Sequence, residues 1–181
     1  NPLVLDGEEL EVLEVKQNNQ PVAKGGNPAE GYVVDRTSLS LQPAQDAFTV
    51  ETLVRIYPEQ NTALEGLYKS GGNWCTQCEA EGFRRITFFP DRPDNMATYS
   101  TRIIADQIAA PVLLSNGNLI DQGQLENGRH YTVWEDPFPK PSYLFALVAG
   151  DLACLDDTYV TASGRQVMLC IYAAPKDLDK L

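Results

Sequence analysis

The sequence has very little histidine and little positive charge. Its 181 residues contain one histidine, His130, and 14 Lys and Arg against 25 Asp and Glu, which gives a net charge of −11. A zinc site of the H-E-x-x-H type needs two histidines on one helical face, so this chain cannot form one by itself. A surface this acidic repels phosphate groups and anionic lipid, so we expect neither nucleic acid nor a membrane as a partner.

Long apolar runs and helical periodicity are also missing. The longest apolar stretch, residues 143–149, is far shorter than the roughly 20 residues that a membrane helix needs. The first residue is Asn1, and no methionine or basic and apolar leader precedes it, which suggests a trimmed beginning. With 43% apolar and 22% charged residues, the composition is typical of a folded protein, and we expect one domain over 1–181.

Short runs that alternate between apolar and polar residues indicate β-strands. The clearest run is 48–56, in which the even-numbered positions from Phe48 to Ile56 form one face. Similar runs rich in β-branched and aromatic residues occupy 10–15, 102–105, 130–134, 143–148 and 166–172. Together they predict an all-β fold, a mostly antiparallel β-sandwich or saddle.

Turn signals separate these runs, at 25–28, 71–73, 115–118, 127–128 and 163–165. Asn116-Gly117 lies between two apolar stretches, 112–114 and 119–120, and predicts a hairpin there. The segment 136–141 contains three prolines, which cannot donate hydrogen bonds to a sheet. We therefore expect this segment to be an extended connection between strands.

The four cysteines allow several interpretations. Cys75 and Cys78 have C-x-x-C spacing, which occurs in redox pairs and in half of some zinc sites, although incidental thiols fit better because no strand-to-helix context surrounds them. Cys154 and Cys170 are sixteen residues apart, and we expect no second close pair from them. A domain of this size needs no disulfides, so we expect reduced thiols. His130 lies in a strand-like run, and we assign it no catalytic role.

A dense group of charged residues follows the C-x-x-C motif. Residues 77–85 read Q-C-E-A-E-G-F-R-R. In one interpretation, Arg84 or Arg85 pairs with Glu79 or Glu81 in a structural cluster. In the other, a carboxylate of this segment faces a cleft and captures a cationic group, which requires that the carboxylate be rigidly held. The residues alone leave both interpretations open.

Four segments resemble bacterial aminopeptidase N, a family of zinc-dependent alanyl aminopeptidases. They are NTALEGLYKSG at 61–71, CTQCEAEGFRRITFFPDRPD at 75–94, LLSNGNLIDQGQLENGRHYTVWEDPFPKPSYLFALVAGDL at 113–152, and the 163–165 turn with 167–172 after it. The resemblance covers most of the chain from about Leu3 onward. It implies the non-catalytic N-terminal β domain of an enzyme that releases single residues from peptide N-termini.

The resemblance also implies roles for two residues. In the family, a glutamate of this domain reaches the α-ammonium of the substrate, and a glutamine lines the pocket for its first side chain; by position in Q-C-E-A-E-G these are Glu79 and Gln77. A carboxylate is the natural counter-charge for a free amine held at a fixed distance from the zinc. The partners implied are peptide N-termini and the catalytic domain of the same chain, and the location implied is the cytoplasm.

The zinc motif and the G-A-M-E-N motif of the family do not occur in this sequence. We therefore expect the zinc to belong to the longer parent enzyme, with no catalytic residue, metal ligand or activity in this chain alone. The family domain has further strands before the segment that aligns with Asn1, so we expect an unprotected sheet edge here. The alternative function is a free-standing β-sandwich that binds a ligand in a cleft of its own.

Overall fold

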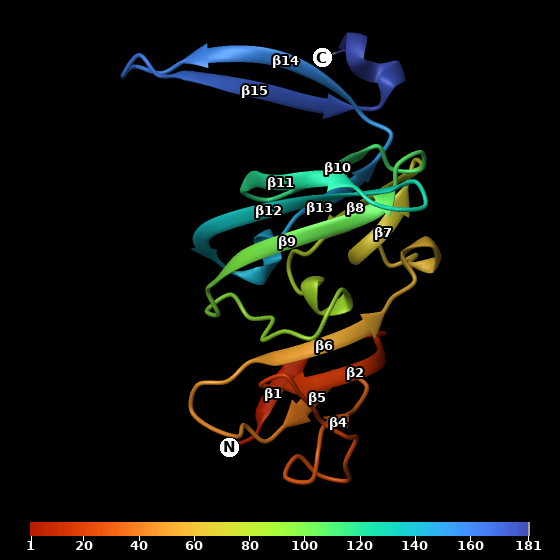
Figure 1. The fold of residues 1–181 in the computed structure, drawn as a ribbon, viewed down its shortest axis with the longest axis vertical. Helices are drawn as coiled ribbons and strands as arrows, with labels where there is room; N and C mark the ends of the chain where they lie inside the picture. The colour runs from red at the N-terminus through yellow and green to blue at the C-terminus, as the bar shows by residue number, and fades with distance from the viewer. Residues whose placement is uncertain (181) are drawn as a thin grey trace.

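Residues 1–180 fold into five small antiparallel sheets, arranged from the N-terminal region to a C-terminal hairpin (Figure 1). The computed structural model describes residues 1–180. Apart from strands, the described residues form only short 3-10 helices, so the predicted all-β antiparallel fold is confirmed. None of the helices in this part of the chain is long and apolar enough to cross a membrane.

The N-terminal third contains two three-stranded sheets around one core. Strand β6 shows the predicted alternation, with Val50, Thr52 and Val54 partly buried and the residues between them exposed. The core consists of buried apolar side chains from both sheets and from the loop after η2: Leu5, Val15, Leu39, Leu41 and Phe88. The first sheet is ordered β1 (Leu3–Asp6), β5 (Ser38–Leu41), β4 (Val33–Val34), and the second β3 (Gln20–Pro21), β2 (Glu11–Gln17), β6 (Val50–Arg55).

The middle of the chain contains two further sheets around a second core. Ile103, Ala110, Leu113 and Ala149 are its buried residues, and Trp74 and Trp134 pack against them. One sheet is ordered β10 (Val112–Ser115), β13 (Leu147–Gly150), β8 (Asn73–Gln77), β7 (Gly66–Ser70). The other is ordered β11 (Asn118–Gln124), β12 (Arg129–Lys140), β9 (Ala97–Asp106).

An aromatic cluster links the η2 helix (Phe83–Arg85) to the middle sheets. The Phe83 ring packs edge-on against Phe89 and Phe145, with ring centroids 5.1 and 5.2 Å apart, and Tyr99 lies against all three. The Lys140 ammonium lies 3.9 Å from the centroid of the Tyr99 ring and pairs with Asp136. Such stacked rings hold η2, and with it the charged segment that precedes it, against the sheets.

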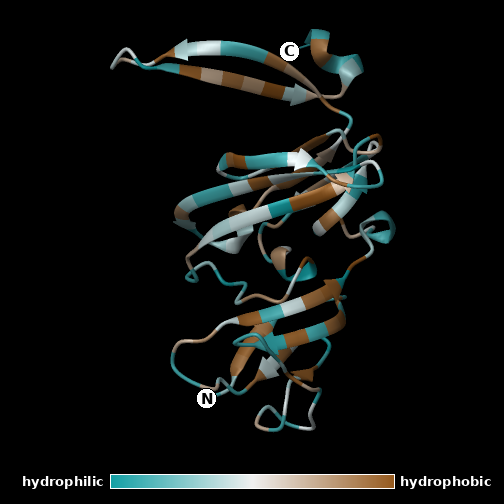
Figure 2. Cartoon of the chain, in the orientation of Figure 1, coloured by the Kyte–Doolittle hydropathy of each residue, from teal (hydrophilic) through white to brown (hydrophobic). Residues whose placement is uncertain are grey.

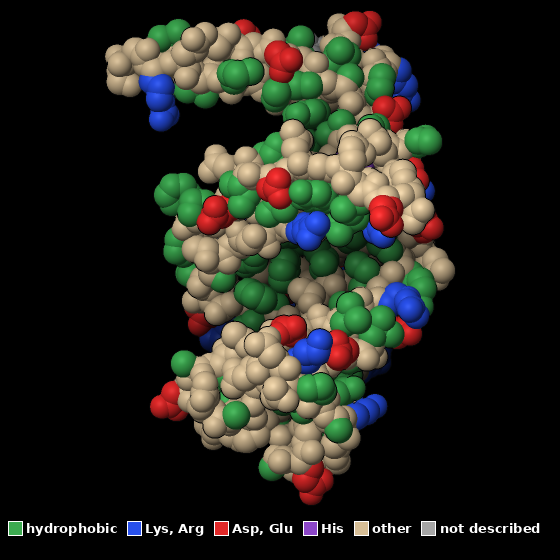
Figure 3. All heavy atoms as spheres, viewed as in Figure 1, with side chains coloured by type: hydrophobic (Ala, Val, Ile, Leu, Met, Phe, Trp, Pro, Cys, Tyr) green, Lys and Arg blue, Asp and Glu red, His purple; other side chains and the backbone are tan. Residues whose placement is uncertain are grey.

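The last elements form a hairpin that projects from the rest of the chain. Strands β14 (Ala153–Val160) and β15 (Gln166–Ala173) pair only with each other, and η4 (Pro175–Lys180) follows them. Figure 3 shows an open gap between this hairpin and the sheets below it. Strand β15 is mostly apolar, whereas the middle of β14 is hydrophilic (Figure 2), and most residues of both strands are exposed.

The predicted hairpin at Asn116-Gly117 is wrong. The strands on either side, β10 and β11, join different sheets: β10 pairs with β13, and β11 pairs with β12. Gly117 has a φ of +87°, and a Cβ on it would lie 2.1 Å from the carbonyl oxygen of Glu135. The glycine is therefore required by a close crossing between two sheets and not by a two-residue hairpin turn.

The predicted strand at 143–148 starts too early. The helix η3 (Ser142–Leu144) follows Pro141, and β13 begins at Leu147. The side chain of Asn116 explains the difference, because its amide donates to the Leu144 carbonyl at 3.1 Å and its oxygen accepts from the Ala146 amide at 2.6 Å. The proline-rich segment is extended as expected, but it lies within β12, across a register shift between Asp136 and Lys140.

Candidate functional site

Gln77 is the last residue of β8, and Glu79 lies in the turn that follows it. Both residues are exposed, whereas Cys78 between them is only 3% exposed. The side-chain amide of Gln77 donates to the backbone carbonyl oxygen of Glu79 at 3.1 Å. The peptide bond from Glu79 to Ala80 is cis. The structure thus brings the two residues together.

The loop after Glu79 is folded tightly against β8. The amide of Gly82 donates to the Cys78 carbonyl at 2.8 Å, which closes the loop over Glu79 to Glu81. A Cβ on Gly82 would lie 2.3 Å from the Gln77 carbonyl oxygen, a backbone atom that cannot give way cheaply. Gly82 is therefore needed for this close approach, which fixes the backbone on both sides of Glu79.

A buried carboxylate anchors the other end of the segment. Asp91 is 3% exposed, and its Oδ2 accepts hydrogen bonds from the Arg84 backbone amide and from Arg84 Nε, both at 3.1 Å. Arg84 also donates to the Asp91 carbonyl at 3.0 Å, and Ser142 Oγ donates to Asp91 Oδ1. Asp6 accepts from the Asp91 amide at 2.9 Å. This network connects η2 to the N-terminal sheet and to η3.

The two arginines after the site pair with other carboxylates. Arg84 lies 3.4 Å from Glu81, in addition to its contacts with Asp91. Arg85 pairs with three glutamates of the N-terminal region and of the loop before β7: Glu8 at 3.3 Å, Glu9 at 2.8 Å and Glu65 at 3.3 Å. The salt-bridge interpretation is therefore correct for Glu81 but not for Glu79, which forms no ion pair within residues 1–180.

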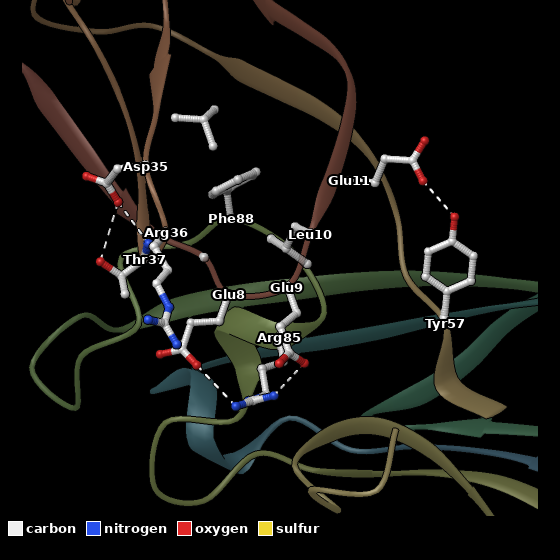
Figure 4. A pocket seen from close by; sticks show the side chains of 12 residues that line it. Glu8, Glu9, Leu10, Glu11, Asp35, Arg36, Thr37, Tyr57, Arg85 and Phe88 are labelled. Atoms are coloured by element: carbon white, nitrogen blue, oxygen red, sulfur yellow. Dashed lines mark hydrogen bonds and ion pairs between the residues drawn. The ribbon is translucent and has the colours of Figure 1, made fainter. Parts of the chain in front are cut away.

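One cavity of the described residues lies away from this site. It measures about 730 Å³, is lined by the β1–β2 turn, by 34–37 and by Tyr57, Arg85 and Phe88, and contains neither Gln77 nor Glu79 (Figure 4). Several of its charged groups are satisfied internally: Arg85 binds Glu8 and Glu9, and the Tyr57 hydroxyl donates to Glu11 at 2.7 Å.

The C-x-x-C pair does not have the features of a redox site. All four cysteines are free thiols, as expected. Burial, together with the nearby Asp91, raises the pKa of the Cys78 thiol to about 12. A thiol must be deprotonated to act as a nucleophile, so Cys78 is inert near neutral pH. Buried Cys78 instead packs beneath Gln77 and Glu79 as a small apolar side chain.

The expectation that Cys154 and Cys170 stay apart is wrong. Both thiols donate to the same carboxylate oxygen of Asp156: Cys170 Sγ lies 2.8 Å and Cys154 Sγ 3.2 Å from Asp156 Oδ1. The hairpin register places Asp156 opposite Cys170 and Cys154 opposite Tyr172. The sequence contained the information needed to predict this cluster, because pairing the two strands about the 163–165 turn gives this register. The linear spacing of the two cysteines alone does not show it.

The single histidine does not fit a catalytic metal. His130 is 9% exposed, and its Nε2 lies 2.7 Å from the Ala110 carbonyl oxygen, so it has a structural role. A zinc site of the H-E-x-x-H type has no second histidine here. Residues 1–180 therefore supply no zinc centre of the H-E-x-x-H type.

The fold and the Q-C-E-A-E-G segment define a class of protein, the β-rich N-terminal domain of a metallopeptidase. Residues 1–144 match the peptidase M1 N-terminal domain, and the chain belongs to this family. It is 54% identical to aminopeptidase N of Caulobacter vibrioides over 174 residues, or 96% of this chain and 20% of that protein. It is 50% identical to aminopeptidase N of Escherichia coli over 179 residues, or 99% of this chain and 20% of that protein.

Solved structures agree with the fold. Aminopeptidase A of Legionella pneumophila, determined in complex with aspartic acid, superposes with a TM-score of 0.91 at 42% identity, over 99% of this chain and 21% of that one. An M1 zinc metallopeptidase of Deinococcus radiodurans superposes with a TM-score of 0.76 at 20% identity, over 96% of this chain and 40% of that one, and supports the fold alone. The chain spans about a fifth of the length of the curated bacterial relatives that it matches. It is homologous to the N-terminal domain of aminopeptidase N.

Proposed function

We propose that this chain is the part of a zinc aminopeptidase that caps the active site and holds the N-terminus of the peptide substrate. Glu79 binds the α-ammonium group, and Gln77 contributes to the pocket for the first side chain. The observation that carries the proposal is the free carboxylate of Glu79. Both neighbouring arginines bind other carboxylates, so Glu79 is available for a cation from outside the chain.

The surroundings of Glu79 support this role. A carboxylate binds an ammonium group well when it is held rigidly and needs little ordering on binding. The backbone that carries Glu79 is fixed, because the Gln77 side-chain amide donates to the Glu79 carbonyl and the Gly82 amide donates to the Cys78 carbonyl. In this role Glu79 positions the substrate and exchanges no proton with it. The catalytic zinc and the reaction belong to the rest of the longer enzyme.

The test is made in the complete aminopeptidase polypeptide and removes the negative charge of Glu79. We expect Glu79→Gln to lower kcat/KM for aminoacyl substrates about 100-fold, which corresponds to about 2.7 kcal/mol, while the zinc content stays unchanged. The matched control is Glu81→Gln, which removes the same charge two residues further on and should leave kcat/KM nearly unchanged. A near-normal kcat/KM for Glu79→Gln would exclude the anchoring role.

The partner proposed for this chain is the catalytic part of the same enzyme. One face of the β14–β15 hairpin carries Leu155, Tyr159, Val167, Leu169 and Ile171 beside a single Asp157, and we call it the apolar hairpin face. Neither strand pairs with any other strand among residues 1–180. Four of these side chains, those of Leu155, Tyr159, Leu169 and Ile171, are between 38% and 58% exposed, an unusual state for a folded monomer. Because the matching relatives are about five times longer, we propose that their additional chain covers this face.

Cysteine labelling tests whether the rest of the complete enzyme covers the apolar hairpin face. Tyr159→Cys places a thiol on the apolar hairpin face, and Thr158→Cys places one on the opposite face, one residue away. In this 181-residue chain, both new thiols should react with a maleimide. In the complete enzyme, the thiol at 159 should be protected and the thiol at 158 should react. Equal labelling of both positions in the complete enzyme would exclude this contact.

A further inference from the structure

Opposite the apolar hairpin face, the β14–β15 hairpin gathers two thiols and a carboxylate on one surface. Cys154, Asp156 and Cys170 project from the same face of the hairpin, because Asp156 is opposite Cys170 and Cys154 lies two residues before Asp156. Their potential ligand atoms all lie within 4.8 Å of one another. Cys170 and Asp156 are exposed and Cys154 is half-buried, so the group is accessible from solvent.

From this arrangement we propose that Cys154, Asp156 and Cys170 bind a soft divalent cation of the Zn²⁺ class. This site is independent of the Glu79 proposal and lies outside the motifs of the catalytic zinc. It departs from the sequence-based expectation that no residue of this chain binds a metal. Two sulfurs and one carboxylate oxygen are suitable ligands for such an ion, and water can take the fourth position.

The distances between the ligand atoms are close to those of a tetrahedral Zn²⁺ site. With a Zn–S bond of about 2.3 Å and a Zn–O bond of about 2.1 Å, the ligand atoms of a tetrahedral site lie roughly 3.6 to 3.8 Å apart. The two sulfur-to-oxygen distances here are 2.8 and 3.2 Å, so the side chains need to move apart by less than 1 Å. The strand register places all three residues on one face of the hairpin.

The same geometry argues against a disulfide. Cys154 and Cys170 are diagonal neighbours and not direct partners, since Cys154 is opposite Tyr172. Diagonal residues of an antiparallel pair lie about 7 to 8 Å apart at Cα, beyond the usual limit of about 6.8 Å for a disulfide. In addition, the Asp156 oxygen contacts both sulfurs. A cation bridges such a group, whereas a sulfur–sulfur bond would have to form past the carboxylate.

Binding exchanges protons for the metal. The two thiols each release one proton, and the divalent ion binds two thiolates and the carboxylate of Asp156, with no change in oxidation state. The ion thereby neutralises two of three negative charges on the ligand set. It also joins β14 to β15 through side chains, in addition to their backbone hydrogen bonds.

Cadmium titration tests the site, because Cd²⁺ binds thiolates and gives a sulfur-to-metal charge-transfer band in the ultraviolet. The reduced 181-residue chain is titrated with Cd²⁺ while absorbance is measured, and alkylation followed by peptide mass spectrometry shows which cysteines are protected. We expect the band to saturate at one equivalent and to protect Cys154 and Cys170. Asp156→Asn should weaken binding about tenfold while leaving the band in place.

The matched controls are two serine variants. Cys154→Ser with Cys170→Ser should abolish the band, and Cys75→Ser should keep it, with circular dichroism used to compare their folds. A band that persists in the double variant and disappears in Cys75→Ser would overturn the proposal. So would the absence of any band in the reduced wild-type chain, or a Cys154–Cys170 disulfide that forms in air and resists Cd²⁺.

Discussion

Arg84 Nε donates a hydrogen bond to Asp91 Oδ2 at 3.1 Å, and the backbone amide of Arg84 donates to the same oxygen. This pair connects the segment after Glu79 to the rest of the fold, because Asp91 also accepts from Ser142 and donates its amide to Asp6. The position of the candidate site therefore depends on a carboxylate that is itself almost entirely buried.

We expect Asp91→Ala to be strongly destabilising. Removing one partner of a buried ion pair leaves the other charge without compensation and typically costs about 3 to 5 kcal/mol. Urea unfolding at neutral pH measures the change in the free energy of unfolding. The control is Asp94→Ala, which breaks an exposed pair with Arg92 and should change stability little. Similar midpoints for the two variants would show that the Asp91 network is not important for stability.

A methyl group at Gly82 should displace the site. Its Cβ would lie 2.3 Å from the Gln77 carbonyl, so Gly82→Ala forces the backbone apart and should cost about 1 to 3 kcal/mol in stability. In the complete enzyme, the same variant should raise KM, because Glu79 moves with the loop. Gly26→Ala is the control, since its nearest contact would be an ordinary 3.6 Å from a side-chain atom. Equal stability of the two variants would contradict the close packing.

Thiol reactivity tests the burial of Cys78. Because burial raises the pKa of Cys78 to about 12, a disulfide reagent at pH 8 should leave it unmodified in the folded chain and modify it in denaturant. Cys78→Ala should therefore leave the native thiol count unchanged and lower the denatured count by one. A lower native count in this variant would show that Cys78 is accessible and would reopen the redox interpretation of the C-x-x-C motif.

Acid should weaken the turn after β9. Asp106 Oδ1 accepts from the amides of Ala109 and Ile108, both at 2.9 Å, and these bonds lower the pKa of Asp106 below its ordinary value. The contribution to stability is therefore present above the unfolded pKa and is lost as the pH falls through the lower folded pKa.

Unfolding midpoints between pH 7 and pH 2 measure this effect. Asp106→Asn should destabilise the chain at pH 7 and make its stability less dependent on pH below about 4. The control is Asp46→Asn, because the Asp46 carboxylate accepts no hydrogen bond among residues 1–180. If Asp106→Asn keeps the full acid dependence of the wild type, other carboxylates are responsible.

The sequence predicted the strands that have one buried and one exposed face. Strand β6 alternates between partly buried and exposed residues along its whole length. Strand β15 was also predicted, although it has no buried face. The turn residues were a poorer guide to the fold. Asn116-Gly117 has the composition of a hairpin turn, but the strands on either side of it join different sheets. Gly117 lies close to Glu135, and because these residues are eighteen positions apart, no local sequence pattern predicts the contact.

The candidate site was predicted from a resemblance, and the residues alone left its role open. The pairing of Arg85 with Glu8 and Glu9 depends on a contact across 76 residues, so the sequence could not show that Glu79 remains free. The Asp156 cluster was missed for another reason. Its three members come together only when 153–173 is read as a folded hairpin, although the turn that sets the register was already identified.

Because β14 and β15 project from the sheets, we expect this hairpin to unfold independently of the rest of the chain. A two-stranded hairpin by itself is marginally stable in water, whereas β2 and β6 pack on a closed apolar core. Backbone amides of 153–173 should therefore exchange with solvent deuterium through a local opening that leaves the rest of the chain folded. In this 181-residue form, a single unfolding free energy describes the two packed cores, and the hairpin has an equilibrium of its own.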